Sequence, residues 1–508
     1  MSQSFLREYN TIVKDPRLVD ILVGYCYPST YRAGMTSLAT HLFYRILNSR
    51  EDVSCERYFR FDTKSPIHSI ETSRHLKENH LVTFSLTWEE DIVHLIQMLE
   101  KSAIDPSANK RRDQDPIVVV GGPVPSANPE PFVDFVDAFV IGEGDLVINH
   151  IIDVMKESST RAHALELLSG IPGVYVPSAN PTSIKHLIID RIDDLLYPVA
   201  QIIPDVPEGS KLEPVFGKSF LLEVTRGCGH SCRFCLVGHI CRPRRARTFS
   251  RLMQIVEEGI ENTPVDKVSL IGSSLGDIDQ IAELSSWIVN KNLELSAPSL
   301  RADTVTFELL STLVKGGQRT LTIAPETGSE RLRKIVGKGL SDAEIEHAVM
   351  LASETGYKSV KLYFIIGLPE ESQDDIIAIA DMTKRLARKS GLRITASISP
   401  FVPKARTRWE REVQQSVEVL RKKAGIIEKE LRNHPNAVME SSDPRNARIQ
   451  AALSIGARDL GRVIVLAAKY GGLGGWRRAE KETKVAFFSI ANDPNRKDDA
   501  LPWSFITH

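Results

Sequence analysis

The chain has 508 residues, of which 42% are hydrophobic and 25% are charged, and its 64 basic and 65 acidic side chains give a formal charge of -1. This length suffices for about three domains with cores of their own, which excludes a small scaffold held together by disulfides. The composition is that of an ordinary globular protein and indicates no net attraction to nucleic acid or membranes.

The first residues, MSQSFLREYNTIVKDPR, contain acidic side chains and lack the apolar core of a secretory signal. No run of the sequence reaches the roughly 18 to 20 apolar residues that span a bilayer. We therefore expect a cytoplasmic protein with no membrane partner. In a reducing compartment the six cysteines are not expected to pair, so clustered cysteines indicate metal or redox chemistry. Cys26 and Cys55 stand alone and are interpreted as small buried residues.

Residues 1–205 are predicted to form an α/β domain of the doubly wound, Rossmann-like type. Apolar strands lie within 18–28, 81–91, 116–132 and 138–145, and each ends in a loop of Gly, Pro, Ser, Thr or aromatic residues. In any single loop these residues are explained by a turn alone and do not indicate a ligand. Four successive strands with the same ending predict one crevice, because ligands bind at the carboxyl ends of parallel strands and glycine lets backbone approach them.

Residues 206–410 are predicted to form a partial (β/α)6 barrel, whose chemistry would lie at the carboxyl ends of its strands. Prolines become frequent before this region, which places a boundary near 205. Residues 411–508 are predicted to be a mainly helical region on the substrate side. The six expected barrel strands lie within 219–228, 267–277, 293–303, 319–332, 359–371 and 393–404.

Three of the six cysteines, Cys228, Cys232 and Cys235, have the spacing C-x3-C-x2-C directly after the first barrel strand. Structural zinc prefers a closed set of four ligands and paired C-x2-C units, although His230 or His239 could supply a fourth. Electron-transfer ferredoxins also use four cysteines for each cubane. Three thiolates instead leave one iron of a four-iron, four-sulfur cluster open to bind another molecule.

The cysteine spacing, with Phe234 before the last cysteine, resembles the radical S-adenosylmethionine (SAM) superfamily. The resemblance implies that the open iron chelates the amino and carboxylate groups of SAM. Reduction of the cluster then cleaves SAM to methionine and a 5'-deoxyadenosyl radical. GSSLGD (272–277), APETGSERL (324–332) and YFIIGLPEE (363–371) resemble the cofactor segments of the superfamily. The cofactor-binding residues that this implies are Phe234, Gly272, Ser273, Ser274, Glu326, Arg331, Ile365 and Gly367.

The first domain resembles the cobalamin-binding domain of cobalamin-dependent radical SAM methyltransferases. One departure is that no Asp-x-His-x-x-Gly occurs, so that motif offers no histidine to the cobalt. Either cobalamin binds with its tail displaced and no protein histidine below it, or the domain binds nothing. The residues implied to bind cobalamin are Tyr27, Pro28, Tyr31, Gly34, Met35, Ser85, Leu86, Thr87, Trp88, Gly121, Gly122, Pro123, Gly142, Glu143 and Gly144.

The resemblance implies C-methylation of an unactivated carbon by the adenosyl radical and methylcobalamin, with a second SAM remethylating the cobalt. Abstraction of a hydrogen atom needs no general base, and we identify no Ser/His/Asp signature or other catalytic side chain. The chain most resembles archaeal enzymes that methylate a glutamine of methyl-coenzyme M reductase, a post-translational modification in methanogenesis. The implied partners are the alpha subunit of that reductase and an electron donor such as ferredoxin or flavodoxin.

Other interpretations remain open at this stage. CRPRRAR (241–247) has four arginines in seven positions and could contact the phosphates of RNA, as in a radical methyl- or methylthiotransferase. The simpler interpretation, a solvated or cofactor-contacting loop, is favoured, so a nucleic-acid partner is not expected. A non-catalytic cluster or corrinoid carrier would have no use for the three SAM-like segments. Cys241 is expected to be structural, because a fourth thiolate would block the open iron.

Overall fold

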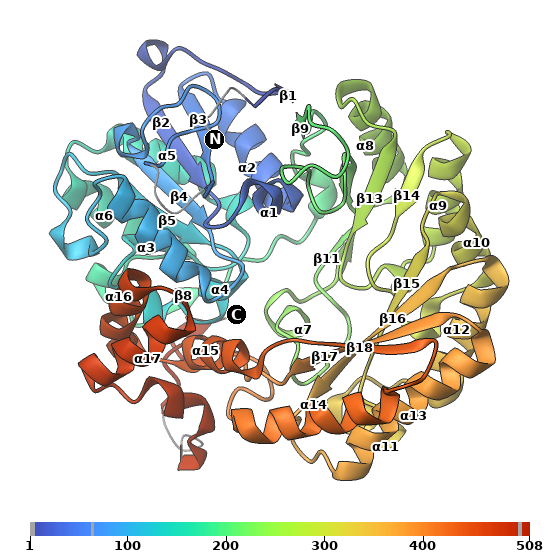
Figure 1. Cartoon of the computed structure of the whole chain (residues 1–508). Helices are drawn as coiled ribbons and strands as arrows, with labels where there is room; N and C mark the ends of the chain where they lie inside the picture. Colours follow the sequence, from blue (N-terminus) through green and yellow to red (C-terminus); the bar gives the residue numbers. More distant parts are fainter. Residues whose placement is uncertain (1–5, 62–65, 496–499, 508) are drawn as a thin grey trace.

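The computed structural model of the chain describes residues 6–61, 66–495 and 500–507. Figure 1 shows two α/β lobes side by side, the first coloured blue to cyan and the second green to orange. The red C-terminal helices lie against the first lobe. Among the described residues, no helix is both long enough and apolar enough to cross a membrane.

The first lobe contains a six-stranded sheet in the order β3-β2-β4-β5-β6-β7. Its first five strands are parallel and β7 is antiparallel. The strand order reverses between β2 and β4, and such a switch point opens a crevice at the carboxyl ends of the strands. The strands are β2 (Ile21–Cys26), β3 (Val53–Tyr58), β4 (Leu81–Ser85), β5 (Ile117–Gly121), β6 (Ala138–Val140) and β7 (Val174–Tyr175).

Helices cover both faces of this sheet. One face packs on α2 and α5, with α1 and α6 beside them, and the other packs on α3 and α4. The C-terminal helices α15, α16 and α17 add to the second face, where α16 contacts α3. These helices are α1 (Tyr31–Thr36), α2 (Leu38–Asn48), α3 (Asp91–Lys101), α4 (Pro123–Ala127), α5 (Ile148–Glu157), α6 (Arg161–Ser169), α15 (Pro444–Ile455), α16 (Gly461–Tyr470) and α17 (Gly472–Thr483).

The second lobe is an open barrel of parallel strands with helices on its outside. A bridge from Leu300 to Ile323 joins the sheet β10-β13-β14 to the sheet β15-β16-β17-β18. The strands are β10 (Phe220–Glu223), β13 (Lys267–Ile271), β14 (Glu294–Ser296), β15 (Thr320–Glu326), β16 (Ser359–Ile366), β17 (Arg393–Pro400) and β18 (Ala437–Ser441). The helices are α8 (Phe249–Asn262), α9 (Ile281–Asn290), α10 (Phe307–Lys315), α11 (Glu330–Val336), α12 (Asp342–Thr355), α13 (Gln373–Ser390) and α14 (Val417–Leu431).

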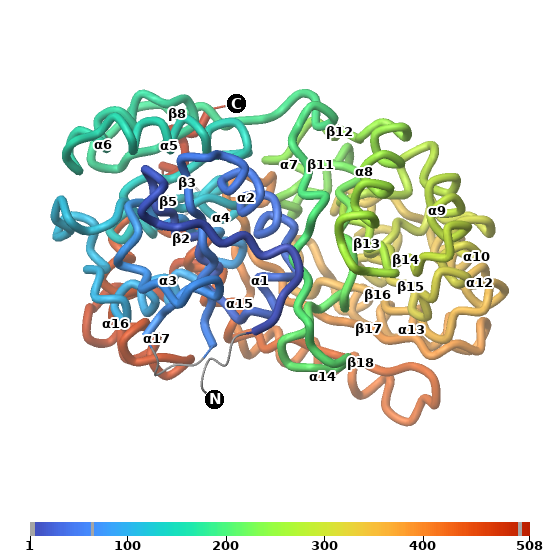
Figure 2. The backbone as a smooth tube through the Cα atoms, turned by 90° about the horizontal axis from the view of Figure 1, so that it is seen from above, coloured from blue at the N-terminus to red at the C-terminus, as the bar shows by residue number. Residues whose placement is uncertain are grey.

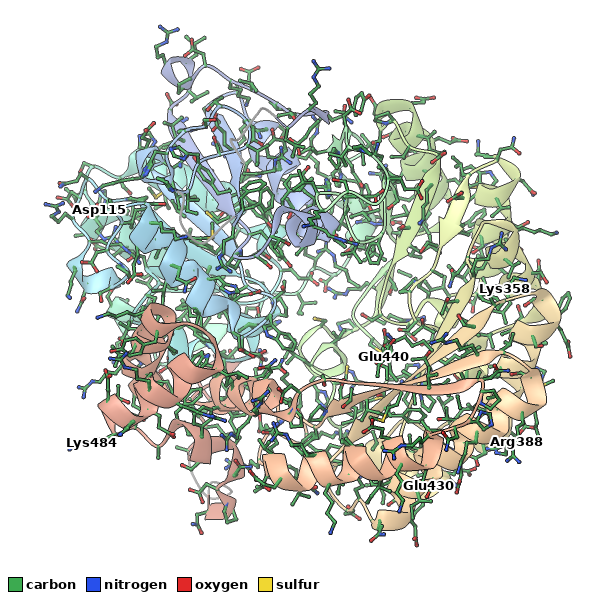
Figure 3. All side chains as sticks on the ribbon, viewed as in Figure 1. Asp115, Lys358, Arg388, Glu430, Glu440 and Lys484 are labelled. Atoms are coloured by element: carbon green, nitrogen blue, oxygen red, sulfur yellow. The ribbon has the colours of Figure 1, made fainter. Side chains whose placement is uncertain are left out.

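The sequence of β16 shows how the barrel separates its two faces. Leu362 and Phe364 are buried in the core under the helices, whereas Lys361 and Tyr363 alternate with them and face the inside. Lys361 Nζ lies 2.7 Å from Glu440 Oε2. Glu440, labelled in Figure 3, belongs to β18. The inner face is therefore polar, and the 40% exposure of Tyr363 shows that the protein leaves it open.

The predicted fold class, with a doubly wound first domain and a partial barrel, is confirmed. All six predicted barrel strands are present, and β18 adds an unpredicted seventh. Its sequence, AVMES, is short and only partly apolar, and it becomes a strand by pairing with β17. The domain boundaries at 205 and 410 stay predictions. The described residues also contain three two-stranded ribbons, formed by β1 (Glu8–Tyr9) with β9 (Ile203–Pro204), β8 (Ile184–Lys185) with β19 (Ile506–Thr507), and β11 (Thr225–Arg226) with β12 (Arg245–Ala246).

Candidate functional site

The three motif cysteines occupy one loop at the carboxyl end of β10. This cysteine loop (227–236) runs from β11 to the short helix α7 (Val237–Ile240), and both figures of the backbone place it between the lobes (Figures 1 and 2). Gly227 has a φ of 74°, and a Cβ there would lie 1.9 Å from the Cys241 carbonyl oxygen. Only glycine fits this turn, which explains the residue before Cys228.

The environment of the cysteines disfavours free thiolates. Cys232 is buried, whereas Cys228 and Cys235 are half-buried. Burial raises the pKa of Cys232 to about 11 and also raises the pKa of Cys235, although N–H groups of Val237 and Gly238 that bond its sulfur act in the opposite direction. These thiols therefore become thiolates at neutral pH only if a cation stabilises the negative charge, and iron is such a cation.

The two histidines near the cysteines do not complete a zinc site. In the described part of the chain, no three His, Cys, Asp or Glu side chains surround one point as a single metal ion requires. His230 Nε2 lies 2.8 Å from Asp277 Oδ2, and His239 Nδ1 lies 2.7 Å from the Cys235 carbonyl. Both candidate zinc ligands thus have other partners. A cubane makes a different demand, because its cysteine sulfurs bind separate iron atoms.

Phe234 anchors the cysteine loop to the rest of the barrel. Its ring packs against an apolar cluster that contains Leu368, Phe401 and Trp409, and Ile365 packs against the same cluster. The backbone adds two bonds, since the Arg233 N–H donates to the Val336 carbonyl at 2.9 Å and the Arg233 carbonyl accepts from the Trp409 N–H at 3.2 Å. Phe234 therefore fixes the loop, and Ile365 lies at the same junction.

Glu326 is the buried carboxylate beside the cysteine loop. It ends β15 with a φ of 70°, after a shift in register that follows Ile323. Burial raises the pKa of Glu326, and the ammonium of Lys338, 3.1 Å from Oε1, acts against this shift. Arg301 acts in the same direction as Lys338, and both cations also influence Cys232. One carboxylate and two cations thus gather next to the cluster ligands.

Arg331 makes its contacts with Glu370 and Asp375 and not with Glu326. Its Nη2 donates to the Glu370 carbonyl at 3.0 Å and pairs with Asp375, and about half of its side chain is exposed. Arg301 and Lys338, which the sequence analysis did not single out, are the cations near Glu326. Arg301 follows β14 at the carboxyl edge of the barrel, where functional residues are expected, and this position could have identified it from the sequence.

The segment after β13 packs against the cysteine loop. Ser274 Oγ donates to Asp277 Oδ2 at 2.6 Å, so this aspartate connects Ser274 to His230. A Cβ on Gly272 would lie 2.6 Å from Thr225 Cγ2, which requires the glycine for packing. Ser273 is exposed. The segment is therefore placed to offer backbone groups and Ser273 to a ligand.

Gly367 follows β16 with a φ of 82°, and its N–H donates to Glu371 at 2.9 Å. Lys423 pairs with the same carboxylate. The buried Oε1 of Gln415 lies about 3.7 Å from the position of a Cβ on Gly367 and has no hydrogen-bond partner among the described residues. A polar group of a ligand beside Gly367 would satisfy this oxygen.

A cavity of about 430 Å³ lies between the carboxyl ends of the first sheet and the residues on either side of the cysteine loop. This interlobe cavity extends along the sheet between α2 and α5 and has mainly apolar walls. Its volume is in the range of small-molecule and cofactor sites. The barrel contributes Glu223, Arg226, Ile240, Cys241 and Ile271 to its wall. The predicted cobalamin residues that line it are Ser85, Thr87, Gly121, Gly122, Pro123, Gly142, Glu143 and Gly144.

Glycine occurs at three positions of the cavity wall for different structural reasons. Gly122 and Gly142 have φ values of 114° and 103°, and a Cβ on either would meet the backbone of Leu86 or Leu187 at 2.6 Å or less. These two glycines serve the packing of the chain itself. A Cβ on Gly121 would have no neighbour closer than 3.8 Å, so this position is open toward the cavity.

The other predicted cobalamin residues lie outside the cavity wall. Tyr27 is nearest, with its hydroxyl 3.2 Å from Thr87 Oγ1, and the carbonyl of Pro28 lies 3.0 Å from His94 Nδ1. Leu86 is buried beneath the wall, and Trp88 is 46% exposed.

Tyr31, Gly34 and Met35 belong to a buried region around α1. The Tyr31 hydroxyl donates to Glu8, the Met35 sulfur lies 3.2 Å from Arg57 Nη1, and Gly34 packs on an aromatic ring. The structure therefore does not bring these three residues to the interlobe cavity.

The arginine-rich segment is tied to the protein itself. Arg245 and Arg247 are buried and donate to the carbonyls of Ile189 and Ile192. Arg242 and Arg244 are exposed, yet each donates to a carbonyl of a neighbouring loop, at 2.9 Å and 2.6 Å. These contacts show that the segment binds to other parts of its own chain, and the absence of a nucleic-acid partner stays a prediction.

Comparison with known structures confirms the architecture. At 15% identity the fold resembles TsrM from Kitasatospora setae, a radical S-adenosylmethionine methyltransferase solved with cobalamin and a [4Fe-4S] cluster (TM-score 0.55; 92% of this chain and 99% of that chain). It also resembles OxsB, a cobalamin-dependent S-adenosylmethionine radical enzyme, at 15% identity (TM-score 0.50; 92% of this chain and 72% of that chain).

Sequence comparison identifies the family. Residues 39–177 match the family of N-terminal regions of radical SAM proteins, and residues 222–383 match the radical SAM superfamily. The uncharacterized protein MJ0966 of Methanocaldococcus jannaschii is 33% identical over 412 residues, which cover 81% of this chain and 83% of that protein. The chain therefore belongs to the radical SAM superfamily.

Proposed function

We propose that the protein is a cobalamin-dependent radical SAM enzyme that transfers a methyl group to an unactivated carbon. The observation that carries this proposal is the interlobe cavity, which lies between the carboxyl ends of the first sheet and residues that flank the cysteine loop, Arg226 and Cys241. Gly121 and Glu143 would hold a corrinoid in this cavity, and Cys228, Cys232 and Cys235 would hold the cluster in the adjoining loop. TsrM, which shares the fold, was solved with both cofactors.

The cofactors supply an electron for SAM cleavage and a methyl group for transfer. Overall, one acceptor C–H, two molecules of SAM and two electrons from a low-potential donor give the methylated acceptor, methionine, 5'-deoxyadenosine and S-adenosylhomocysteine. The acceptor hydrogen ends in 5'-deoxyadenosine, and the new carbon–carbon bond replaces the C–H bond.

The residues of the barrel would bind and orient SAM. Lys338 and Arg301 are placed to attract the methionine carboxylate, and Glu326 is placed to accept from the amino group. The Gln415 Oε1 beside Gly367 offers an acceptor to a donor group of the same ligand.

The shape of the interlobe cavity supports cobalamin with its tail displaced. The part between α2 and α5 is lined by the apolar side chains of Leu42, Val119 and Ile151, which would suit an aromatic base. The buried hydroxyl of Tyr25, also in the lining, has no hydrogen-bond partner of normal geometry in the described residues. His186 lines the cavity as well, but its Nδ1 lies 2.6 Å from Arg406 Nη1.

We propose a glutamine side chain of methyl-coenzyme M reductase as the acceptor, which makes the reaction a cytoplasmic post-translational modification in methanogenesis. Support comes from the likeness to glutamine C-methyltransferases and from the open, polar inner face of the barrel, where Tyr363 and Glu440 are exposed. The proposed partners are the alpha subunit of that reductase and a ferredoxin or flavodoxin.

The test is incubation of the reconstituted, reduced protein with SAM, cobalamin and a glutamine peptide from the reductase, followed by mass spectrometry. We expect the peptide to gain the mass of one CH2 group and 5'-deoxyadenosine to appear. A parallel reaction with tRNA tests RNA modification. Modified tRNA beside an unchanged peptide would contradict the proposed acceptor, and absence of 5'-deoxyadenosine with an intact cluster would contradict radical chemistry.

A further inference from the structure

Two arginines of the barrel form ion pairs with two carboxylates of the first lobe. Arg226 Nη1 lies 2.6 Å from Asp145 Oδ2. Arg245 forms a fork on Glu143, with distances of 2.9 Å and 3.1 Å from Nη2 and Nη1 to its two oxygens. All four side chains are at least 85% buried. We call these four residues the interlobe ion network.

The network lies between the two proposed cofactor positions. Arg226 and Arg245 face each other on the ribbon of β11 and β12, and Arg226 is two residues before Cys228. Glu143 and Asp145 belong to the loop after β6, and both line the interlobe cavity with Arg226. The network therefore joins the start of the cysteine loop directly to the cavity wall.

The charges in this network are mutually compensated. Burial alone would lower the pKa of Arg226, but Glu223 and Asp145 raise it above the ordinary arginine value. Arg226 also holds Glu223 of β10 through its Nε, at 2.7 Å. The Arg226 guanidinium thus lies between carboxylates of the barrel and of the first lobe. The planar fork of Arg245 on Glu143 fixes orientation as well as distance.

We propose that the interlobe ion network is a positioning device that sets the cysteine loop against the interlobe cavity, so that cluster and corrinoid face each other at a fixed separation. This inference rests on the proposed function. Generation of the radical requires only the barrel, whereas methyl transfer requires both lobes in register. Loss of the network should therefore uncouple the two events, and misplacements of about 1 Å can cost about a hundredfold in rate.

The test compares Asp145→Asn and Glu143→Gln with the matched control Glu130→Gln. Glu130 also connects the first lobe to a distant segment, with Arg458 Nε at 2.6 Å from its Oε2, but lies outside the cavity lining and the cysteine loop. Each protein is loaded with iron, sulfide and cobalamin, and its melting temperature and metal content are measured. The decisive readout is the magnetic dipolar coupling between the reduced cluster and cob(II)alamin, which reports their separation without an acceptor.

We expect wild type and Glu130→Gln to share one narrow distance distribution, and the two network variants to show a shifted or broadened one. Their formation of 5'-deoxyadenosine should stay within about twofold of wild type, because the barrel is intact. Unchanged distributions in both network variants would overturn the positioning role. Loss of 5'-deoxyadenosine formation would also overturn it, by making the network part of radical generation. A wild-type protein that binds no cobalamin would instead refute the proposed function.

Discussion

The cysteine loop and the interlobe cavity differ in how their sequences encode them. The cysteine loop contains three predicted metal ligands within eight residues. Three cysteines so close together indicate metal binding by themselves, because clustered thiolates are typical metal ligands. The cavity is assembled from α2, α5, four strand ends and the barrel, through aliphatic side chains and backbone. Reactive ligands are visible as a local pattern, whereas a binding volume depends on how distant segments pack.

Substitution of the cysteines is expected to have the largest effect and to affect the cysteine loop without affecting the interlobe cavity. Replacing Cys228, Cys232 or Cys235 with Ser should abolish the cluster and SAM cleavage, because the remaining thiolates no longer hold the iron. Iron content, visible absorbance and 5'-deoxyadenosine formation are the measurements. Cobalamin binding should survive in the same variants.

Cys241→Ser is the matched control for this prediction. Cys241 lines the interlobe cavity, and burial raises its pKa to about 11. We expect this variant to keep both the cluster and SAM cleavage. A variant that lost its iron would make Cys241 a ligand and would contradict the open position on the cluster.

A second comparison concerns the cation for the SAM carboxylate. Lys338→Met should raise the KM for SAM by about 10- to 100-fold, the usual loss for a charge-assisted hydrogen bond. Arg331→Ala should change KM less than about threefold, because Arg331 is half exposed and already paired with Asp375. The reverse order of effects would make Arg331, and not Lys338, the ligand of the SAM carboxylate.

A substitution in the cavity wall can reduce the space for cobalamin without changing the cluster ligands. Gly121→Val should weaken cobalamin binding by about tenfold or more, because its side chain would extend into the cavity wall. Gly425→Val on α14, where the Cβ position is open, is the control. Titration with cobalamin gives the binding constant. Equal affinities in both variants would place the corrinoid elsewhere.

Ser273 should have the smallest effect. Its side chain is exposed, and the glycine before it already brings the backbone close to β11. Ser273→Ala should therefore alter the KM for SAM by less than about twofold if the contact is made by backbone groups alone. A change of tenfold would show that the hydroxyl itself binds SAM.

The sequence predicts β2, β4, β5 and β6 of the first sheet and six strands of the barrel, because buried parallel strands are continuous or alternating apolar segments. It misses β3 and β7 of the first sheet and β18 of the barrel, whose sequence AVMES becomes a strand only beside β17. Among the site residues, the cysteines and Glu326 come together at one loop. Arg301 and Lys338 were missed because isolated cations carry no pattern, and their proximity to Glu326 arises from the closure of the barrel.

The first lobe shows the same limit. Loops after β4, β5 and β6 reach the cavity, whereas Tyr31, Gly34 and Met35 are used in the buried surroundings of Arg57. The segment that carries these three residues follows a strand end like the others, but packing decides which strand ends remain open. Sequence patterns predict where a crevice begins and not which loops line it.

One measurement tests directly whether the two regions do separate chemistry. The products of the reduced, cluster-containing protein with SAM can be quantified with and without cobalamin. We predict 5'-deoxyadenosine under both conditions and S-adenosylhomocysteine only with cobalamin, because the second SAM gives its methyl group to the corrinoid. Equal amounts of S-adenosylhomocysteine without cobalamin, or no 5'-deoxyadenosine under either condition, would contradict this division of labour.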